Sequence, residues 1–305
     1  MGVDVGGTNI KLGLVRKAGR IIARTCLETK VYARHPAKLI QAMAEGIASL
    51  LRQNGFKKQN VQGVGIGLPG LVDPVKGHVI FLPNIPGWKN IPLRKHLEKK
   101  VGLEVFLDND VNVMTLGEWR FGAGQGSDDM IGMTLGTGVG AGLILGGALY
   151  RGPGFGAGEL GHIPVNLTGP KCSCPSFACL ETYVGNGPLQ RRAAKIFRHP
   201  GITLEEVFAL AKQGNQKALG FWEEAGEYVG TALVGVVNVL NPTKIVIGGG
   251  VANTARFLFP AIRRQIKGRA MPVQAKMARV VRAKLGDDAG LVGSRVLVET
   301  EQNIK

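Results

Sequence analysis

The sequence lacks long hydrophobic runs, and this excludes one broad class of protein. No apolar stretch reaches the roughly 18 residues that a membrane span needs. The most apolar segment, residues 229–241, is VGTALVGVVNVLN, and we expect it to form a buried helix. A charged leader followed by an apolar core, the pattern of a secretory signal, is also missing. The sequence therefore predicts a cytoplasmic protein with no membrane partner.

Cysteine is scarce and unevenly placed. The 305 residues include four cysteines, of which Cys172, Cys174 and Cys179 lie within eight positions. Small disulfide-stapled proteins instead spread an even set of cysteines along a short chain, so that class is excluded. Cys26 stands apart in a strand-like run, where we expect a buried core residue.

Acidic residues are absent from a long stretch of the chain. Between Tyr228 and Gly286 there are ten Lys or Arg residues and no Asp or Glu, within a net charge of +16. Such a surface attracts anions, nucleic acid included. After Tyr228 only Phe257 and Phe259 supply aromatic rings there. We therefore expect a solvated face, or one that attracts an anionic small molecule, and no nucleic-acid partner. Polyphosphate remains an alternative anion.

The first fifteen residues, MGVDVGGTNIKLGLV, place two glycines between apolar runs. A Gly-Gly pair in this setting is typical of a β-hairpin. Glycines also let backbone N–H groups approach a phosphate closely, here with Asp4 before the turn and Lys11 after it. Both interpretations stay open from this stretch alone. It matches neither the P-loop nor the dinucleotide-binding fingerprint.

The same turn occurs twice. Residues 7–15 are GTNIKLGLV and residues 136–144 are GTGVGAGLI. A second pair, residues 61–70 and 244–250, forms a strand that ends in glycine and follows a helix-like stretch, 36–54 and 215–241 respectively. The wider spacing in the second half predicts an insertion of about fifty residues within 150–214. We therefore predict a duplicated α/β chain whose two glycine turns hold one phosphate chain between them.

Residues 104–119, EVFLDNDVNVMTLGEW, begin as a strand and continue as a helix. Asp108, Asn109 and Asp110 lie at the junction. Asn or Asp at such a position is a good helix cap, and capping alone would explain the motif. An acid at the carboxyl end of a strand can also accept the proton of an alcohol that attacks phosphorus. Asp110, in the first helical turn, suits that role, and Asp108 would then face away or cap the helix.

The segment from 156 to 185 is rich in possible ligands. Cys-x-Cys-x₄-Cys lies ten residues after His162, and a Cys₃His set is typical of structural zinc. Three buried or free thiols are the alternative. Glu159 and Glu181 flank this set. Carboxylates and a histidine held on one rigid loop could accept hydrogen bonds from the vicinal hydroxyls of a sugar.

Seven motifs together resemble one known family over essentially the whole chain. They are, in order, D-x-G-G-T (4–8), G-x-P-G-x-V-D (67–73), P-N-I-P-G-W (83–88), N-D (109–110), G-T-G (136–138), E-x-G-H (159–162) and G-G-G-V (248–251). This set resembles the ROK family of repressors, open reading frames and sugar kinases, and its ATP-dependent glucokinases in particular.

The resemblance implies an actin-like (ribonuclease H-like) duplicated α/β fold with two domains around a central cleft. We expect one domain from residues 1–120 plus 288–305 and a larger one from 121–287. It also implies ATP-dependent, Mg²⁺-dependent phosphorylation of a hexose, usually at O6, with glucose as the expected acceptor. A homodimer is expected from the family alone.

The resemblance also assigns the site residues. Asp110 would be the general base, and His162 would serve zinc with one ring nitrogen and sugar with the other. The sugar would contact Pro69, Gly70, Asn84, Asn109, Asp110, Glu159, His162 and Glu181. ATP and Mg²⁺ would contact Asp4, Gly6, Gly7, Thr8, Asn9, Lys11, Thr137, Gly138, Gly249 and Gly250. Structural zinc would be held by His162, Cys172, Cys174 and Cys179.

One segment departs from the family pattern C-x-C-G-x-x-G-C-x-E. Here CSCPSFACLE places Pro175 and Ala178 where the pattern has glycine. A positive φ at either position is impossible for proline and strained for alanine. The departure puts the zinc geometry and the direction of Glu181 in question.

Other functions remain as alternatives. Within the kinases these are N-acetylmannosamine, N-acetylglucosamine, allose, mannose and fructose as acceptors, although Leu71 offers no polar group to an N-acetyl substituent. A sugar-sensing repressor would carry a further N-terminal DNA-binding domain, whereas the phosphate-turn motif here begins at residue 4, and we expect no room for such a domain. An actin-like or chaperone-like ATPase has no need of the sugar-binding loop. We therefore expect a hexose kinase.

Overall fold

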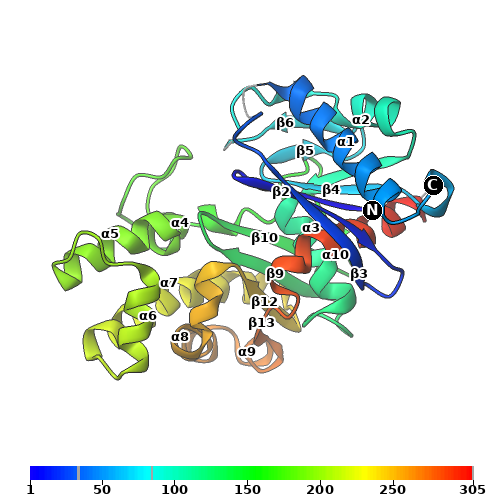
Figure 1. Ribbon diagram of the computed structural model, residues 1–305. Coiled ribbons are helices and arrows are strands. Elements are labelled where there is room, and N and C mark those ends of the chain that lie inside the picture. Colours follow the sequence, from blue (N-terminus) through cyan, green and yellow to red (C-terminus); the bar gives the residue numbers. More distant parts are fainter. Residues whose placement is uncertain (33–34, 84, 304–305) are drawn as a thin grey trace.

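Two five-stranded sheets of the same topology form the framework of the computed structural model, which describes residues 1–32, 35–83 and 85–303 (Figure 1). The first sheet has the order β3-β2-β1-β4-β8 and the second β11-β10-β9-β12-β13. The first consists of β1 (Gly2–Val5), β2 (Asn9–Val15), β3 (Ile21–Glu28), β4 (Val64–Leu68) and β8 (Val105–Asn109). The second consists of β9 (Met130–Leu135), β10 (Val139–Leu145), β11 (Ala148–Tyr150), β12 (Lys244–Gly248) and β13 (Arg279–Arg282).

The predicted duplication is confirmed strand by strand. In each sheet the first strand pairs antiparallel with the second, the second antiparallel with the third, and the first parallel with the fourth. The fourth then pairs parallel with the fifth. The two glycine turns therefore join equivalent strands, β1 to β2 and β9 to β10. Likewise β4 and β12, which carry the second repeated pair, are equivalent central strands.

Helices cover the sheets by burying one stripe each. The first half contains α1 (Pro36–Gln53), α2 (Leu93–Val101) and α3 (Asp110–Phe121), and α10 (Ala289–Gln302) packs beside them. In α1, Leu39, Met43, Ile47 and Leu50 recur at helical spacing and are buried against the first sheet. Pro36 lies in its first turn, where the missing N–H costs nothing. The helix predicted over 36–54 is thus confirmed.

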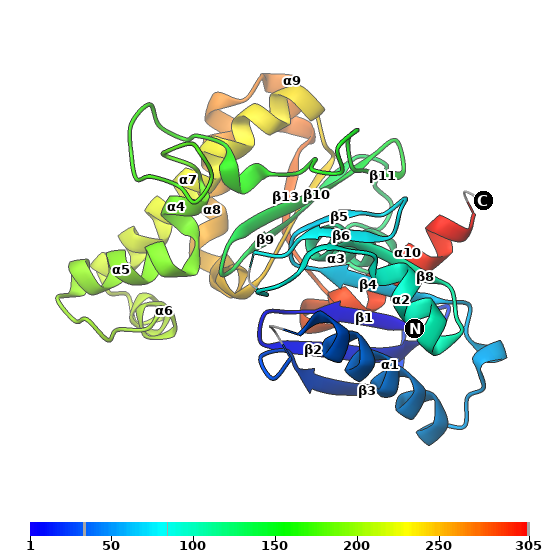
Figure 2. The same ribbon diagram turned by 90° about the horizontal axis from the view of Figure 1, so that it is seen from above.

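Helices α3 and α10 cross between the two sheets (Figure 2). The crossing is close because each helix presents a glycine. A Cβ on Gly293 would lie 1.7 Å from the Val113 carbonyl oxygen, and one on Gly117 would lie 2.7 Å from that of Ala289. Side chains from both sheets and both helices form one cluster here, including Val113, Leu116, Met130, Ile144, Val246, Val296 and Leu297.

The second half carries the predicted insertion. Between β11 and β12 lie a long loop, α4 (Glu181–Val184), α5 (Asn186–Phe197), α6 (Leu204–Lys212) and α7 (Gln216–Leu240). The described residues between β3 and β4 of the first half form α1 and the short 3₁₀ helix Lys58–Asn60. Then α8 (Ala255–Arg269) and α9 (Pro272–Met277) lead to β13. Helix α7 is the predicted 215–241 helix. Within the apolar segment 229–241, Val229, Leu233 and Val237 are buried while Val239 is exposed, so the segment is buried along one face.

Two further features complete the fold. A small sheet in the order β5-β6-β7 consists of β5 (Leu71–Asp73), β6 (His78–Phe81) and β7 (Lys89–Ile91). Among the described residues, no helix is both long enough and apolar enough to cross a membrane. The expectation that Cys26 is buried is wrong. It lies on edge strand β3, where Arg24, Cys26 and Glu28 alternate onto the exposed face.

Candidate active site and metal centre

The two glycine turns have related backbone hydrogen bonds. In the first, Gly6 N–H donates to Asn9 O at 2.8 Å, and Thr29 closes the turn by donating its hydroxyl to Gly6 O at 2.7 Å. In the second, Gly136 N–H donates to Gly138 O at 3.0 Å. The hairpin interpretation of the first stretch is therefore confirmed. Gly7, Thr8 and Asn9 are exposed at its tip, so the same turn can also receive a phosphate, which stays a prediction.

Asp4 and Lys11 face each other across this hairpin. They are register partners of β1 and β2. Lys11 Nζ donates to Asp287 O at 3.1 Å, in the turn before α10. Burial raises the pKa of Asp4, the Lys11 charge opposes that rise, and the Asp287 charge adds to it. The half-buried carboxylate is thus held beside a cation at the base of the first turn.

The junction of β8 and α3 orients Asn109 and Asp110. Asn109 is the helix cap, because its Oδ1 accepts the N–H groups of Val111 at 2.8 Å and Asn112 at 3.2 Å. Asp110 is the first helical residue, and its Oδ1 accepts Val111 N–H at 2.9 Å. The capping interpretation is right for Asn109, and it leaves Asp110 available for chemistry.

Asp110 and Asp4 both lie beside Gly67 of the central strand β4. Gly67 of β4 is the register partner of Asp4 on one side and of Asp108 on the other. A Cβ at Gly67 would lie 3.4 Å from Asp110 Cα. Burial and then the Asp4 charge raise the pKa of Asp110 to about 7, against hydrogen bonds that favour the ionised form. This carboxyl can therefore exchange a proton near neutral pH.

Asp108 has a different environment. Its carboxylate is 2% exposed. Oδ1 accepts Asn109 N–H at 2.7 Å and an Asn112 Nδ2–H at 2.8 Å, and Oδ2 accepts Arg151 Nε–H at 2.6 Å. Of the two alternatives offered for Asp108, facing away from the site is right and capping is not. Arg151 was missed, because no motif or spacing in the sequence links it to the junction. Asn112 was missed although it lies within the 104–119 segment, four residues after Asp108.

The turn after β4 is tied to the same junction. Asn109 Nδ2 donates to Gly70 O at 3.1 Å. Gly70 has a φ of +154°, and a Cβ there would lie 2.3 Å from Phe81 O, so only glycine fits. Pro69 and Gly70 are thus placed beside Asn109, as a shared sugar site requires. Asn84, also predicted to bind sugar, lies outside the described residues.

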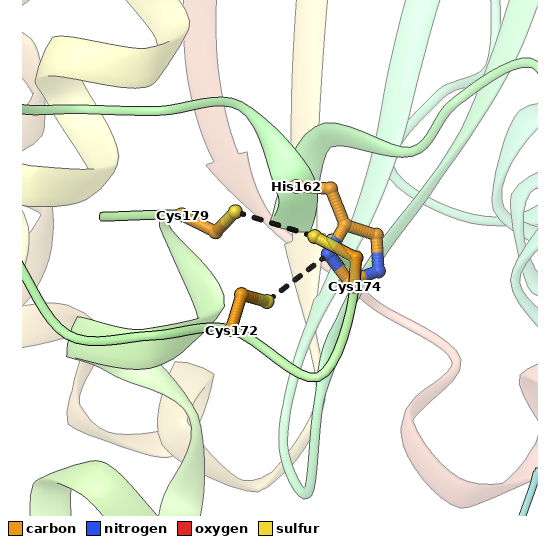
Figure 3. A group of neighbouring side chains, drawn as sticks. All are labelled: His162, Cys172, Cys174 and Cys179. Carbon is orange, nitrogen blue, oxygen red and sulfur yellow. Dashed lines mark hydrogen bonds between the residues drawn. The ribbon is translucent and has the colours of Figure 1, made fainter. Parts of the chain in front are cut away.

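The four predicted zinc ligands meet in one cluster (Figure 3). Their ligand atoms all lie within 4.8 Å of one another. His162 Nδ1 is 3.5 Å from Cys172 Sγ, and Cys174 Sγ is 3.7 Å from Cys179 Sγ. Tetrahedral zinc with Zn–S of about 2.3 Å and Zn–N of about 2.05 Å sets these separations at about 3.6 and 3.8 Å. The donor set and its spacing therefore fit zinc.

The thiols of this cluster differ in acidity. Burial opposes ionisation of Cys172, but hydrogen bonds from Cys174, His162 and Cys179 lower its pKa to about 7. Burial and the neighbouring thiols raise the pKa of Cys179 to about 11. A metal ion binds thiolates, so zinc binding would release protons from this cluster.

The two departures from the family pattern have different consequences. Ala178 has a φ of +54°, in the left-handed region that favours glycine, and it is fully buried. Its backbone is fixed by bonds from Ala178 N–H to Pro170 O and from Val165 N–H to Ala178 O. Pro175 has no positive φ, so it fits its position. The strain predicted for this loop is therefore confined to Ala178, and the ligands still converge.

Two acids extend from the metal cluster. Glu159 Oε2 lies 3.8 Å from His162 Nε2, the ring nitrogen that faces away from the cysteines, and its side chain is 65% exposed. Glu181 begins α4, and its Oε2 accepts Val139 N–H at 2.9 Å. A Cβ at Gly138 would lie 2.6 Å from the same oxygen. Glu181 therefore joins the metal loop to the second glycine turn, and among the described residues its Oε1 accepts no hydrogen bond.

A cavity of about 240 Å³ opens beside Gly250. Gly249, with a φ of +86°, packs so closely that a Cβ would lie 2.3 Å from Leu135 O. The turns after β9 and β12 are therefore adjacent, and Asn186 N–H donates to Gly136 O at 2.8 Å. Sequence analysis missed the other walls of this cavity, which come from the inserted helices and from the turn after β12: Asn186, Gln190, Leu204, Glu205, Phe208, Trp222, Val251, Asn253 and Thr254.

Known proteins are similar to this sequence along nearly its full length. A glucokinase of Thermotoga maritima is 34% identical, with 98% of this chain and 96% of that protein covered. A xylose repressor of Caldicellulosiruptor bescii is 28% identical over 98% of this chain and 77% of that protein.

Solved structures agree with these relatives. The ROK hexokinase of Thermus thermophilus has a TM-score of 0.85 at 33% identity, covering 100% of this chain and 99% of that one. A ROK glucokinase of Streptomyces griseus in complex with glucose and AMPPNP has a TM-score of 0.82 at 34% identity, covering 98% of each chain. The actin-like α/β fold expected from the sequence is therefore confirmed. The ROK family model matches residues 1–301, and the chain belongs to the ROK family.

Proposed function

We propose that the protein is an ATP-dependent hexose kinase that phosphorylates glucose at O6, with Asp110 as the general base. The observation that carries the proposal is the environment of Asp110. It is fixed at the start of α3, between Asn109 and the Asp4 strand, and its pKa is raised to about 7. A carboxylate of that basicity can take the proton of a sugar hydroxyl as the oxygen attacks the γ-phosphorus.

The acceptor would bind between the β8–α3 junction and the metal loop. Asn109 and the Pro69–Gly70 turn hold one side through the bond from Asn109 to Gly70 O. Glu159 and His162 Nε2 offer hydrogen bonds to vicinal hydroxyls, and Glu181 offers its free Oε1. Zinc would be structural, held by His162 Nδ1 and the three cysteines, and would fix the direction of the His162 ring.

The donor would lie along the two glycine turns. Backbone N–H groups of Gly7 and Thr8 on one side and of Thr137 and Gly138 on the other would surround the phosphates. Gly6 would shape the first turn, because its own N–H donates to Asn9 O. Asn9 and Lys11 would contribute from β2, and Asp4 would help to hold Mg²⁺, which neutralises charge on the transferring phosphoryl group. Adenosine would occupy the cavity beside Gly249 and Gly250.

Two alternatives concern the acceptor sugar and the reaction itself. Other hexoses, namely N-acetylmannosamine, N-acetylglucosamine, allose, mannose and fructose, would use the same base and differ in contacts to the loops. Sugar sensing without phosphorylation is the second candidate, favoured by the similarity to the xylose repressor along 98% of this chain. A homodimer stays a prediction.

A coupled ADP-release assay with MgATP and a hexose panel tests the proposal. We expect strong turnover with glucose and, in Asp110→Asn, a loss of kcat of at least about 100-fold with sugar binding kept. Asp128→Asn, at an exposed acid far from the junction, is the matched control and should match the wild type. Turnover on another sugar would change the acceptor. Sugar binding without any ADP release would favour the sensor.

A further inference from the structure

We infer that Arg151 is a positioning residue that couples the sugar-binding loop to the catalytic junction through a buried link to Asp108. This inference rests on the proposed function, since the junction matters as the seat of the base. Arg151 directly follows β11 in the second half of the chain, whereas Asp108 belongs to β8 in the first. The pair therefore joins the two halves beside the site.

Both members of this pair are largely buried. Asp108 is 2% exposed and the Arg151 side chain 18%. The Nε–Oδ2 distance is 2.6 Å. A carboxylate taken out of water needs a partner to remain ionised. In every other ion pair among the described residues, the carboxylate is more exposed than that of Asp108.

Asp108 in turn fixes the junction of β8 and α3. Its other oxygen accepts the backbone N–H of Asn109 and the side-chain amide of Asn112. These bonds fix the last residue of β8 and the first turn of α3. Asp110 lies between the two groups that Asp108 binds. A shift of Asp108 would therefore move the base.

Arg151 in turn fixes the start of the loop that leads to Glu159 and His162. Its carbonyl oxygen accepts Ala157 N–H at 3.0 Å, which closes the loop 151–157. Glu159 and His162 follow within five residues of that closure. Arg151 Nη2 also donates to Glu301 Oε1 of α10 at 2.7 Å. One guanidinium thus fixes the start of the sugar-binding loop to β8 and to α10 together, a planar two-sided contact that lysine cannot make.

The consequence is a fixed distance between the loop that holds the sugar and the base that activates it. Misplacement by about 1 Å can cost about 100-fold in rate. Losing the link should therefore reduce kcat/KM for the sugar much more than it changes KM for ATP, because the hydrogen bonds of Arg151 go to Asp108, Glu301 and Ala157 and not, among the described residues, to a glycine turn.

The test separates positioning from charge balance with a paired variant. Arg151→Met alone would leave the Asp108 charge buried without its partner and would destabilise the fold. Arg151→Met combined with Asp108→Asn removes both charges and keeps an oxygen acceptor for Asn109 and Asn112. We expect the double variant to melt within a few degrees of the wild type, yet to lose about 10- to 100-fold in kcat/KM for glucose with KM for ATP changed less than twofold. The single variant Arg151→Lys should retain only part of the wild-type kcat/KM for glucose.

Arg120→Met is the matched control. Arg120 also pairs with α10, through Glu299 at 3.3 Å, but among the described residues it forms no ion pair with β8. It should keep wild-type kinetics. A stable double variant with wild-type kcat/KM would overturn the inference.

Hydrogen exchange gives a readout that does not depend on turnover. The amides of residues 157–162 should exchange faster in the double variant than in the wild type or in Arg120→Met. Unchanged exchange would contradict the coupling even if the wild type phosphorylated no sugar. Absent turnover in the wild type, together with faster exchange in the double variant, would reject the proposed function and leave the link itself supported.

Discussion

At the scale of single residues, the acidity of Asp110 sets the expected pH dependence. Burial and the Asp4 charge raise its pKa to about 7, and the base works only when ionised. We therefore expect kcat/KM for the sugar to be half-maximal near pH 7 and to fall about tenfold per pH unit below it. Asp4→Asn removes the like charge, so it should move the midpoint to lower pH. Rates measured from pH 5 to 9 at saturating MgATP give the answer, and a flat profile would contradict the assignment.

Ala178 makes a second prediction at this scale. An L-residue in the left-handed region costs roughly 1–2 kcal/mol, and a β-branched one costs more. Ala178 adopts a φ of +54° between Cys174 and Cys179. We expect Ala178→Val to weaken zinc binding at least about tenfold, and Ala178→Gly to bind zinc at least as well as the wild type. Competition with a chromogenic chelator measures this, with Ala37→Val on the exposed face of α1 as the control. Equal affinity in all variants would mean that the loop tolerates the backbone change.

At the scale of elements, the metal loop should affect sugar binding more than ATP binding. It carries Glu159 and His162, whereas it reaches the second glycine turn through Glu181, and the first glycine turn belongs to the β1–β2 hairpin. Cys174→Ser should therefore abolish zinc in metal analysis and raise KM for the sugar about tenfold or more, with a smaller rise in KM for ATP. Cys26→Ser removes an exposed thiol on β3 and should behave as the wild type. Full zinc content in Cys174→Ser would refute the ligand set.

The elements also show what sequence could and could not predict. Repeated glycine turns and helical spacing correctly located the duplicated strands, α1, α7 and the insertion, because those signals are local. Cys26 was misplaced because alternation along an edge strand does not say which face meets the core. Arg151 and the cavity walls from α5 and α6 were missed because they depend on segments that meet only after folding. The sugar-binding and nucleotide-binding roles stay predictions, as does the division into residues 1–120 plus 288–305 and 121–287.

At the scale of the whole molecule, the two halves meet where α3 crosses α10 (Figure 2). Asp110 begins the first of these helices, and Gly290 of the second packs against Asp4, since a Cβ there would lie 2.5 Å from the Asp4 carboxyl carbon. A change in the crossing would therefore move both acids of the site. Close packing requires glycine at this crossing. The backbone angles there do not require it, since none of these glycines has a positive φ.

That requirement leads to a prediction for the whole fold. In Gly293→Ala the new methyl would lie 1.7 Å from Val113 O, so the helices must separate and the buried cluster around them must open. We expect a loss of about 3 kcal/mol or more in the free energy of unfolding, comparable to other overpacked or cavity-forming core changes. Gly235→Ala is the matched control, in α7 where a Cβ meets nothing within 4 Å. It should gain about 0.5–1 kcal/mol from helix propensity. Urea unfolding of both variants decides the question, since equal stability would mean that the halves can shift apart without cost. If Gly293→Ala folds at low temperature, its remaining kcat should be far below the wild type, because the helix that begins with the base would have moved.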